Sequence, residues 1–259
     1  MIRSAASLAI LATALAGCAK PGTKPEVADP APWSTEDGKV EVRLAIASEL
    51  IEQGLIDQGL VIIQQVRADG AKAPEIDILH ARCLMLQGLP SEASAMLLEA
   101  RRKAPKDTRI HKYLAVMYAD QGNVAVAVEE LERATRIDKQ DASLWNNLGF
   151  LRLASQDYDG AVAALREAVS LDGTKSKYRN NLGFAFAAAG RDNDALAAFK
   201  GITAPADAHA NLALALEMSG DNAQAETHYE QALQLQPDHA GAQGGLNRIR
   251  TTRQPLESP

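Results

Sequence analysis

The chain has 259 residues, of which 46% are hydrophobic and 23% are charged, a balance typical of a folded, water-soluble protein of one large or two ordinary domains. The net charge of −6 gives no reason to expect nucleic acid as a partner, because such proteins carry a basic footprint, and two cysteines are too few for a disulfide framework. Aromatic residues make up only 4%, so we expect a core of Ala, Leu, Ile and Val, built from helices.

The N-terminal residues have the parts of a secretory signal. Arg3 supplies the positive charge, residues 8–15 form an apolar run too short to span a bilayer, and the sequence "LAGC" ends at Cys18. These four residues resemble the bacterial lipobox, whose cysteine thiol receives a diacylglyceryl group before cleavage makes it the new N-terminus. The resemblance implies a signal peptide over residues 1–17 and a lipid on Cys18, and Ala19 in the next position favours the outer membrane. An ordinary signal peptide with a chance cysteine is the other interpretation.

Residues 18–39 read as a lipidated terminus followed by a tether. The stretch has almost no apolar pattern and contains four prolines, namely Pro21, Pro25, Pro30 and Pro32. Such a composition favours an extended chain with a reach of roughly 3 Å per residue. Trp33, near the end of this segment, either docks on the first helices, which is the preferred interpretation, or is exposed to solvent.

Residues 40–240 repeat with a period of 34 residues. The repeats start at Val40, Pro74, Thr108, Ala142, Ser176 and, after a four-residue deletion, Ala206. Columns 8 and 20 of this alignment contain only Ala or Gly, column 24 is always large and apolar or aromatic, and column 15 is Gly except at Gln156. Two helices approach closely only where facing residues are small, and glycine ends a helix because it adopts a left-handed conformation at low cost. The columns therefore predict six helix–turn–helix units.

This pattern resembles the tetratricopeptide repeat, most clearly in "NLALALEMSGDNAQAETHYEQALQLQP". The resemblance implies an all-α fold, a right-handed α-solenoid of about six helix–turn–helix repeats. Residues 241–253 place Leu246 in column 7 and predict a C-terminal capping helix, although three glycines weaken its helix propensity, and residues 254–259 form a tail. The sequence departs from the pattern at Gln156, at His80 in place of leucine, and in the shortened fifth repeat.

No nucleophile constellation, phosphate loop or metal-ligand spacing is present in the sequence, so we expect no enzyme activity, no cofactor and no metal. His111 and His209 occupy column 4, which packs between helices. Cys83 is expected to be a small buried thiol.

The family resemblance also implies a groove lined by the first helix of each repeat, through columns 2, 5, 9, 12 and 13 with column 6 nearby. Asn amides offer donors and acceptors to an extended peptide, and Phe offers an apolar contact, although Asn in these columns also supports neighbouring helices. Lys112, Asn147 and Lys177 partly resemble the carboxylate clamp of chaperone-binding members, from which Val116 and Asn181 depart. The expected partner-binding residues are Arg109, Lys112, Asn146, Asn147, Phe150, Lys177, Asn180, Asn181, Phe184, Asn211 and Leu214, with Met218 beside them.

A dense basic cluster lies at the junction of the second and third repeats. Its members are Arg101, Arg102, Lys103, Lys106, Arg109 and Lys112. The cluster either binds an acidic partner segment or follows a helix C-terminus, where positive charge is favourable, and the second interpretation is the preferred one.

The lipobox, together with repeats such as "NNLGFLRLASQDYDGAVAALREAV" and "RNNLGFAFAAAGRDNDALAAF", resembles the tetratricopeptide lipoproteins of tight-adherence (Flp-type) pilus assembly. The resemblance implies a non-enzymatic protein–protein interaction scaffold, lipid-anchored at the periplasmic face of the outer membrane. Its partners would be envelope proteins, as an assembly or pilotin factor for the pilus or its outer-membrane secretin. Other candidate roles are a type IV pilus pilotin, an adaptor for peptidoglycan hydrolases or cell division and, more distantly, a murein-active enzyme.

Overall fold

The structure is a computed structural model that describes residues 36–253. Nearly all of this range belongs to one unit, Arg43–Pro259. The predictions for the signal peptide, the lipidated Cys18, the tether with Trp33 and the tail at 254–259 fall on segments outside the described residues, apart from the first residues of the first helix.

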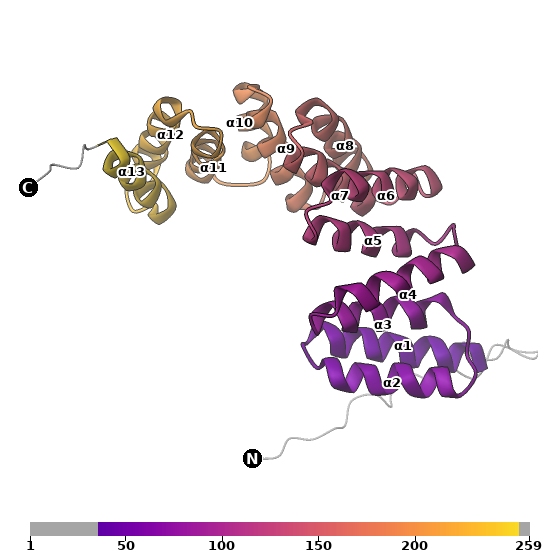
Figure 1. Ribbon diagram of the computed structural model, residues 1–259. Coiled ribbons are helices and arrows are strands. Elements are labelled where there is room, and N and C mark those ends of the chain that lie inside the picture. Colours follow the sequence, from indigo (N-terminus) through magenta and orange to yellow (C-terminus); the bar gives the residue numbers. More distant parts are fainter. Residues whose placement is uncertain (1–35, 254–259) are drawn as a thin grey trace, which may run out of the picture. The chain divides into compact units, whose positions relative to one another are not determined.

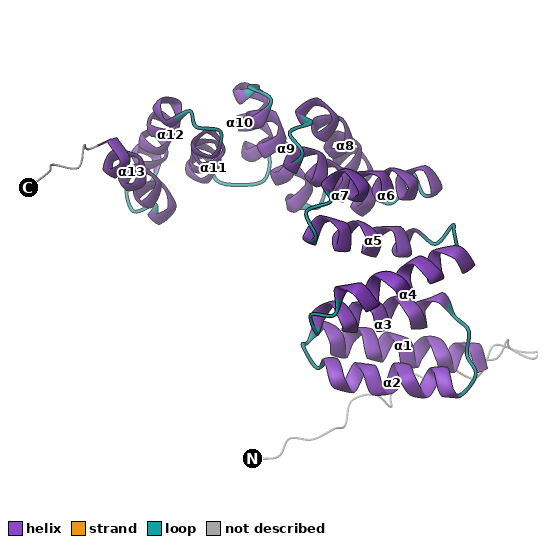
Figure 2. Cartoon of the chain, in the orientation of Figure 1, coloured by secondary structure: helices purple, strands orange, loops and turns teal. Residues whose placement is uncertain are grey.

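Residues 36–253 form thirteen helices and contain no strand (Figures 1 and 2). Consecutive helices pack against each other as antiparallel pairs joined by short turns, which confirms the predicted all-α array of repeats. None of the helices in this described range has the length and apolar character needed to cross a membrane. The helices are α1 (Glu36–Glu52), α2 (Ile56–Ala68), α3 (Pro74–Leu86), α4 (Pro90–Lys103), α5 (Thr108–Asp120), α6 (Val124–Ile137), α7 (Ala142–Ala154), α8 (Tyr158–Leu171), α9 (Ser176–Ala188), α10 (Asp192–Lys200), α11 (Pro205–Met218), α12 (Asn222–Leu235) and α13 (Ala240–Arg253).

The helix boundaries follow local sequence signals. Helices α3, α5, α7 and α9 begin at the first residue of their 34-residue repeat. Four helices have an aspartate N-cap whose carboxylate accepts a backbone N–H of the first turn, which satisfies a donor that the helix itself cannot satisfy. These N-caps are Asp107, Asp141, Asp157 and Asp221.

The turn inside each repeat uses the residue of column 15 in a left-handed conformation. Glycine supplies it in five repeats, with φ of +80° at Gly54 and +78° at Gly122, for example. In the fourth repeat Gln156 adopts φ of +64°, the same conformation without the freedom of glycine. The turn chemistry is therefore common to all six repeats even where the residue differs.

The small residues of columns 8 and 20 and the large residues of column 24 are all buried, so each repeat has the close helix contact that the sequence predicts. In the fourth and fifth repeats column 8 is glycine, and no space is left for a side chain there. A Cβ added at Gly149 would lie 2.5 Å from the Cγ of Leu165, and one added at Gly183 would lie 2.5 Å from the ring of Phe199. Glycine is thus needed at these two positions because the facing side chain fills the space.

The four-residue deletion in the fifth repeat falls on its second helix. Helix α10 has 9 residues, whereas α4, α6, α8 and α12 each have 14. A short turn then leads to Pro205 at the start of α11, where proline fits because the first helical N–H has no intrahelical partner.

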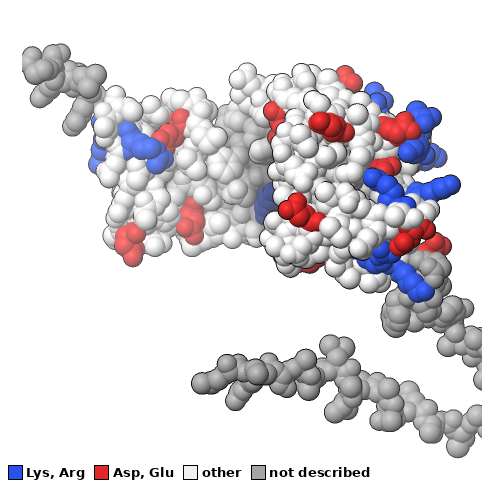
Figure 3. All heavy atoms as spheres, turned by 60° about the horizontal axis from the view of Figure 1, so that its bottom comes forward, with Lys and Arg blue, Asp and Glu red and all other residues white. Residues whose placement is uncertain are grey.

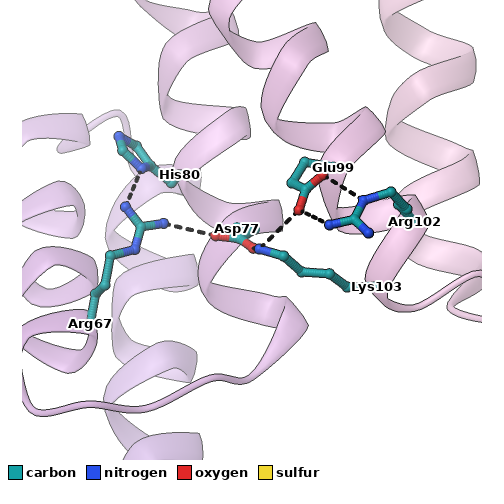
Figure 4. A network of polar contacts seen from close by, with 6 residues as sticks. All are labelled: Arg67, Asp77, His80, Glu99, Arg102 and Lys103. Atoms are coloured by element: carbon teal, nitrogen blue, oxygen red, sulfur yellow. Dashed lines mark hydrogen bonds and ion pairs between the residues drawn. The ribbon is translucent and has the colours of Figure 1, made fainter.

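His80, which replaces leucine in column 7, lies in a polar network that joins α2, α3 and α4 (Figure 4). Arg67 Nη1 lies 2.9 Å from His80 Nδ1, and Arg67 Nη2 donates to Asp77 at 3.0 Å. Lys103 Nζ lies 3.7 Å from the other oxygen of Asp77. Burial and then the Arg67 charge lower the pKa of His80, against the opposing effect of Asp77, so the neutral ring accepts the hydrogen bond from Arg67.

Helix α13 packs against both helices of the sixth repeat, in the stretch where the sequence predicts a cap. One of its glycines has a specific packing reason, because a Cβ on Gly245 would lie 2.1 Å from the ring of Tyr229. Arg248 pairs with Glu217 at 2.9 Å, and Arg250 pairs with Glu226 at 3.0 Å and Glu230 at 2.7 Å. Close packing and ion pairs thus compensate for weak propensity.

Candidate protein-binding surface

The first helices of neighbouring repeats lie side by side, because α7 contacts α9 and α9 contacts α11 in addition to the second helices between them. Column 9 of these helices is apolar, and its side chains reach the surface. Phe150 is 55% exposed, Val116 and Leu214 are exposed, and Phe184 is half-buried. We call Val116, Phe150, Phe184 and Leu214 the apolar row.

The members of the apolar row differ in how firmly they are held. Phe184 meets the buried ring of Phe199 edge-on, with ring centroids 5.4 Å apart and an interplanar angle of 80°. Aromatic pairs prefer this geometry, so the core fixes the orientation of Phe184. Phe150 has more than half of its surface in water, and Met218, one turn beyond Leu214 on α11, is also exposed. The row therefore combines one rigid member with more adaptable neighbours.

Asn146 does not line an exposed surface, in contrast to the sequence prediction. Its side chain is 3% exposed and bridges two repeats. Asn181 Nδ2 donates to Asn146 Oδ1 at 2.8 Å, and Asn146 Nδ2 donates to Asn147 Oδ1 at 3.3 Å. The stacking of α9 on α7 covers Asn146 and pairs both halves of its amide, so Asn146 ties repeats together. Asn180 and Asn211 are only partly covered and keep the exposure that binding a peptide requires.

The basic residues predicted for the groove have different surroundings. Arg109 forms an ion pair with Glu75 of α3 and another with its own N-cap, Asp107, at 2.7 Å. Arg109 therefore joins the second and third repeats. Lys177 is exposed and Lys112 is half-buried. Of the clamp-like set, Asn147 also accepts the hydrogen bond from Asn146, so it is shared between support and surface.

Sequence reasoning left Val116 out of the predicted set, although its exposed, apolar side chain continues the row onto α5. The signal was present in the column itself, since Val116, Phe150, Phe184 and Leu214 all occupy column 9. Val116 was considered only as a departure from the clamp, which demands a polar residue there.

The chemistry of the described residues suits binding. Burial raises the pKa of the Cys83 thiol, which keeps it protonated and unreactive inside α3. His209 and His228 stack between α11 and α12 with their Nδ1 atoms 3.1 Å apart. Within residues 36–253, no group of three or more His, Cys, Asp or Glu side chains is arranged to hold a metal. An exposed apolar row beside asparagine amides can hold an extended peptide by side-chain contacts and by hydrogen bonds to its backbone.

Comparison with known proteins agrees with this architecture. Family models described as tetratricopeptide repeat match residues 50–116, 142–175 and 206–239. No curated protein sequence matches the chain.

Several solved structures have a similar fold. Pseudomonas aeruginosa PilF is 13% identical, with a TM-score of 0.62 over 82% of this chain and 98% of that chain. YrrB, described as a TPR protein with an unusual peptide-binding site, is 20% identical, with a TM-score of 0.56 over 71% of this chain and 97% of that chain. MamA is 20% identical, with a TM-score of 0.50 over 60% of this chain and 92% of that chain.

At these identities the similar structures show the fold alone, and the family models show the repeat. Together with the buried small columns and the left-handed turns, they establish that the described part of this chain is an array of tetratricopeptide repeats.

Proposed function

We propose that this protein is a lipid-anchored scaffold of the bacterial envelope that holds segments of partner proteins along the apolar row. In this proposal it acts as an assembly or pilotin factor for a Flp-type pilus or its outer-membrane secretin. The observation that carries the proposal is the apolar row on successive first helices, in which Val116, Phe150 and Leu214 are exposed and Phe184 is half-buried, in a chain whose N-terminus resembles a lipobox. Repeat arrays commonly use such extended surfaces for binding.

The row is suited to protein partners for physical reasons. Large apolar side chains that reach the surface on neighbouring helices are characteristic of interaction sites when they gather in one patch. Aromatic residues dominate binding energy at protein interfaces, and Phe150 and Phe184 provide two of them on adjacent helices. The half-buried amides of Asn180 and Asn211 lie on the same helices and supply polar contacts.

Site-specific photo-crosslinking tests the partner. A photoreactive residue is placed at Phe150 or Leu214 in living cells, and the matched control is placed at Leu235, an exposed leucine on the second helix α12. We expect the row positions, and not Leu235, to capture a secretin or a pilus assembly component. Capture of a peptidoglycan hydrolase or a division protein would assign the adaptor role instead. Equal crosslinking at all three positions would refute the row as the binding surface.

The membrane anchor has a separate test. Replacing Cys18 by Ala removes the thiol that the lipobox requires, so the variant should lack the mass of the lipid. Because cleavage follows lipidation at the lipobox, the variant should also keep residues 1–17, which mass spectrometry detects. A wild-type protein without a lipid on Cys18, or a variant that is still lipidated, would contradict lipid anchoring at Cys18.

A further inference from the structure

A basic cavity lies where α4, α5 and α6 meet, and none of the apolar row is among its lining residues. Its volume is about 710 Å³, and its lining includes four arginines and no carboxylate. Arg101 and Arg102 come from the last turn of α4, and Arg133 and Arg136 come from the C-terminal half of α6. Two arginines of the basic sequence cluster thus do end a helix, as the sequence predicts, but α6 brings two further arginines to the same place. Figure 3 shows one face of the molecule, on which Lys and Arg form a larger group at the right and a smaller one at the left, each with Asp and Glu nearby.

One side of the cavity is held by a buried ion-pair network. His111 Nδ1 lies 2.7 Å from Glu130 Oε2, and Arg101 Nη1 donates to Glu130 Oε1 at 2.5 Å. His111 Nε2 lies 3.1 Å from the Pro105 carbonyl oxygen. Burial acts to raise the pKa of Glu130, but the His111 hydrogen bond and the Arg101 charge outweigh it, so this pKa lies below its usual value. Glu130 stays ionised and holds Arg101 in one orientation.

Arg133 and Arg136, by contrast, are loosely held. Their side chains are 53% and 65% exposed, and their nearest carboxylates are Glu129 at 3.9 Å and Glu132 at 3.8 Å, one turn away on the same helix. Glu132 is already bound by Arg152 at 2.7 Å. Exposed pairs of this kind contribute about 0.3–0.5 kcal/mol, so exchanging them for a ligand costs little.

We propose that this cavity is a second binding site, which takes a carboxylate-rich peptide segment of a partner protein with an apolar side chain among its acidic residues. Arginine is suited to this because its planar fork meets a carboxylate through two parallel hydrogen bonds. The cavity also has an apolar part, formed by Leu98, Pro105 and Ile137, which a peptide side chain fills and a bare anion does not. The four arginines of the lining give the cavity a charge opposite to that of an acidic segment, in a chain whose net charge is −6.

The experiment measures fluorescence anisotropy with the full-length chain in detergent and a fluorescein-labelled peptide, Glu-Glu-Leu-Glu-Glu. A second peptide with Ser in place of Leu tests the apolar part of the cavity. The double variant Arg133→Ala with Arg136→Ala removes the two loosely held arginines and leaves the Arg101–Glu130–His111 network in place. The control variant, Arg248→Ala with Arg250→Ala, removes the same charge from exposed arginines of α13.

We expect the cavity variant to weaken binding about tenfold or more, the loss of one charge-assisted hydrogen bond or more, and the control to change it about twofold or less. Lysine at both cavity positions should restore only part of the affinity, because the bidentate fork is absent. The Ser peptide should bind more weakly than the Leu peptide. Added salt should weaken binding of the wild type more than that of the cavity variant.

Three results would overturn the proposal. One is no binding of the Leu peptide to the wild type at millimolar concentration. Another is an equal loss of affinity in the cavity and control variants, which would mean that net charge alone causes the loss. The third is arginine-dependent binding of phosphatidylglycerol vesicles or inorganic phosphate without binding of the peptide, which would assign the cavity to phosphate groups. Because the proposed pilus role rests on the apolar row, it stands or falls independently of these outcomes.

Discussion

Gln156 offers a test of whether the turn in each repeat depends on backbone conformation alone. It adopts φ of +64°, where five other repeats have glycine at φ between +70° and +87°. The turn hydrogen bonds are the same as in the third repeat, since the N–H of Asp157 donates to the Arg152 carbonyl at 2.9 Å and that of Asn123 donates to the Tyr118 carbonyl at 2.8 Å. The Gln156 side chain is exposed. Replacing Gln156 by Gly therefore changes only the cost of the left-handed backbone.

The expected magnitude follows from two opposing effects. A left-handed conformation costs a non-glycine residue about 1–2 kcal/mol. Glycine gains more freedom in the unfolded chain, which offsets about 0.4–1 kcal/mol of this. Gln156→Gly should then stabilise the protein by about 0.5–1 kcal/mol. The reciprocal change, Gly122→Gln, should destabilise it by a similar amount, because a Cβ at Gly122 meets nothing within 4 Å and only the backbone penalty remains.

Urea unfolding followed by far-UV circular dichroism measures both variants through their midpoints. The matched control is Ala154→Gly, which introduces glycine at the end of α7, where the backbone is still helical and glycine costs about 0.5–1 kcal/mol. The three variants should thus give an increase for Gln156→Gly and a decrease for the other two. A midpoint that falls in Gln156→Gly, or rises in Gly122→Gln, would show that side-chain contacts and not backbone strain decide the turn.

Three further changes test the packing, the bridge between repeats and the buried ion pair. Ala161→Arg should unfold the fourth repeat, because Ala161 is fully buried against α7 and a long charged chain has no space there; an unchanged melting curve would contradict the column assignment. Asn181→Ala should cost about 1–2 kcal/mol in urea unfolding by leaving the Asn146 carbonyl oxygen unpaired, whereas Asn180→Ala should cost less. Glu130→Gln should lower stability at pH 7 by about 1.5–3 kcal/mol. Because the folded pKa of Glu130 is lowered, the wild type keeps this contribution above the usual carboxyl pKa and loses it as pH falls through the folded value; a pH profile between 7 and 3 that is parallel in both proteins would refute this linkage.

The repeat frame could be predicted from the sequence because its contacts are short in range. Column 8 faces column 24 within one helix pair, so the alignment alone predicts that Gly183 and Phe199 are in contact. The conformation at column 15 follows from glycine in five repeats, and the alignment alone transfers it to Gln156. Helix ends at aspartate caps are equally local. These features depend on residues separated by fewer than about twenty positions and on a pattern seen six times.

The surface could be predicted only in part, because it depends on how one repeat stacks on the next. Asn146 and Asn181 are 35 residues apart, and their hydrogen bond buries an amide that the column assigns to the surface. The basic cavity combines Arg102 and Arg136, which share column 29, but Ala68, Ser170 and Gln234 occupy that column in other repeats, so the alignment as a whole does not predict a basic site. Each of these contacts between repeats occurs once among the described residues, so an alignment of six repeats does not predict it.

The difference between repeated packing positions and unrepeated surface positions indicates where this protein differs from other arrays of its fold. Residues of columns 8, 15, 20 and 24 are constrained by packing in every repeat, so they carry no information about partners. The apolar row and the basic cavity both lie outside those columns. The two surfaces are chemically complementary, since Phe150 offers apolar contact while Arg133 and Arg136 offer charge. A partner that presents an apolar segment and an acidic one engages both, and its affinity gains from effective concentration because the second contact becomes intramolecular. Removing one of the two surfaces should then weaken binding of such a partner. Binding of an isolated segment to the surface that remains should be weakened less.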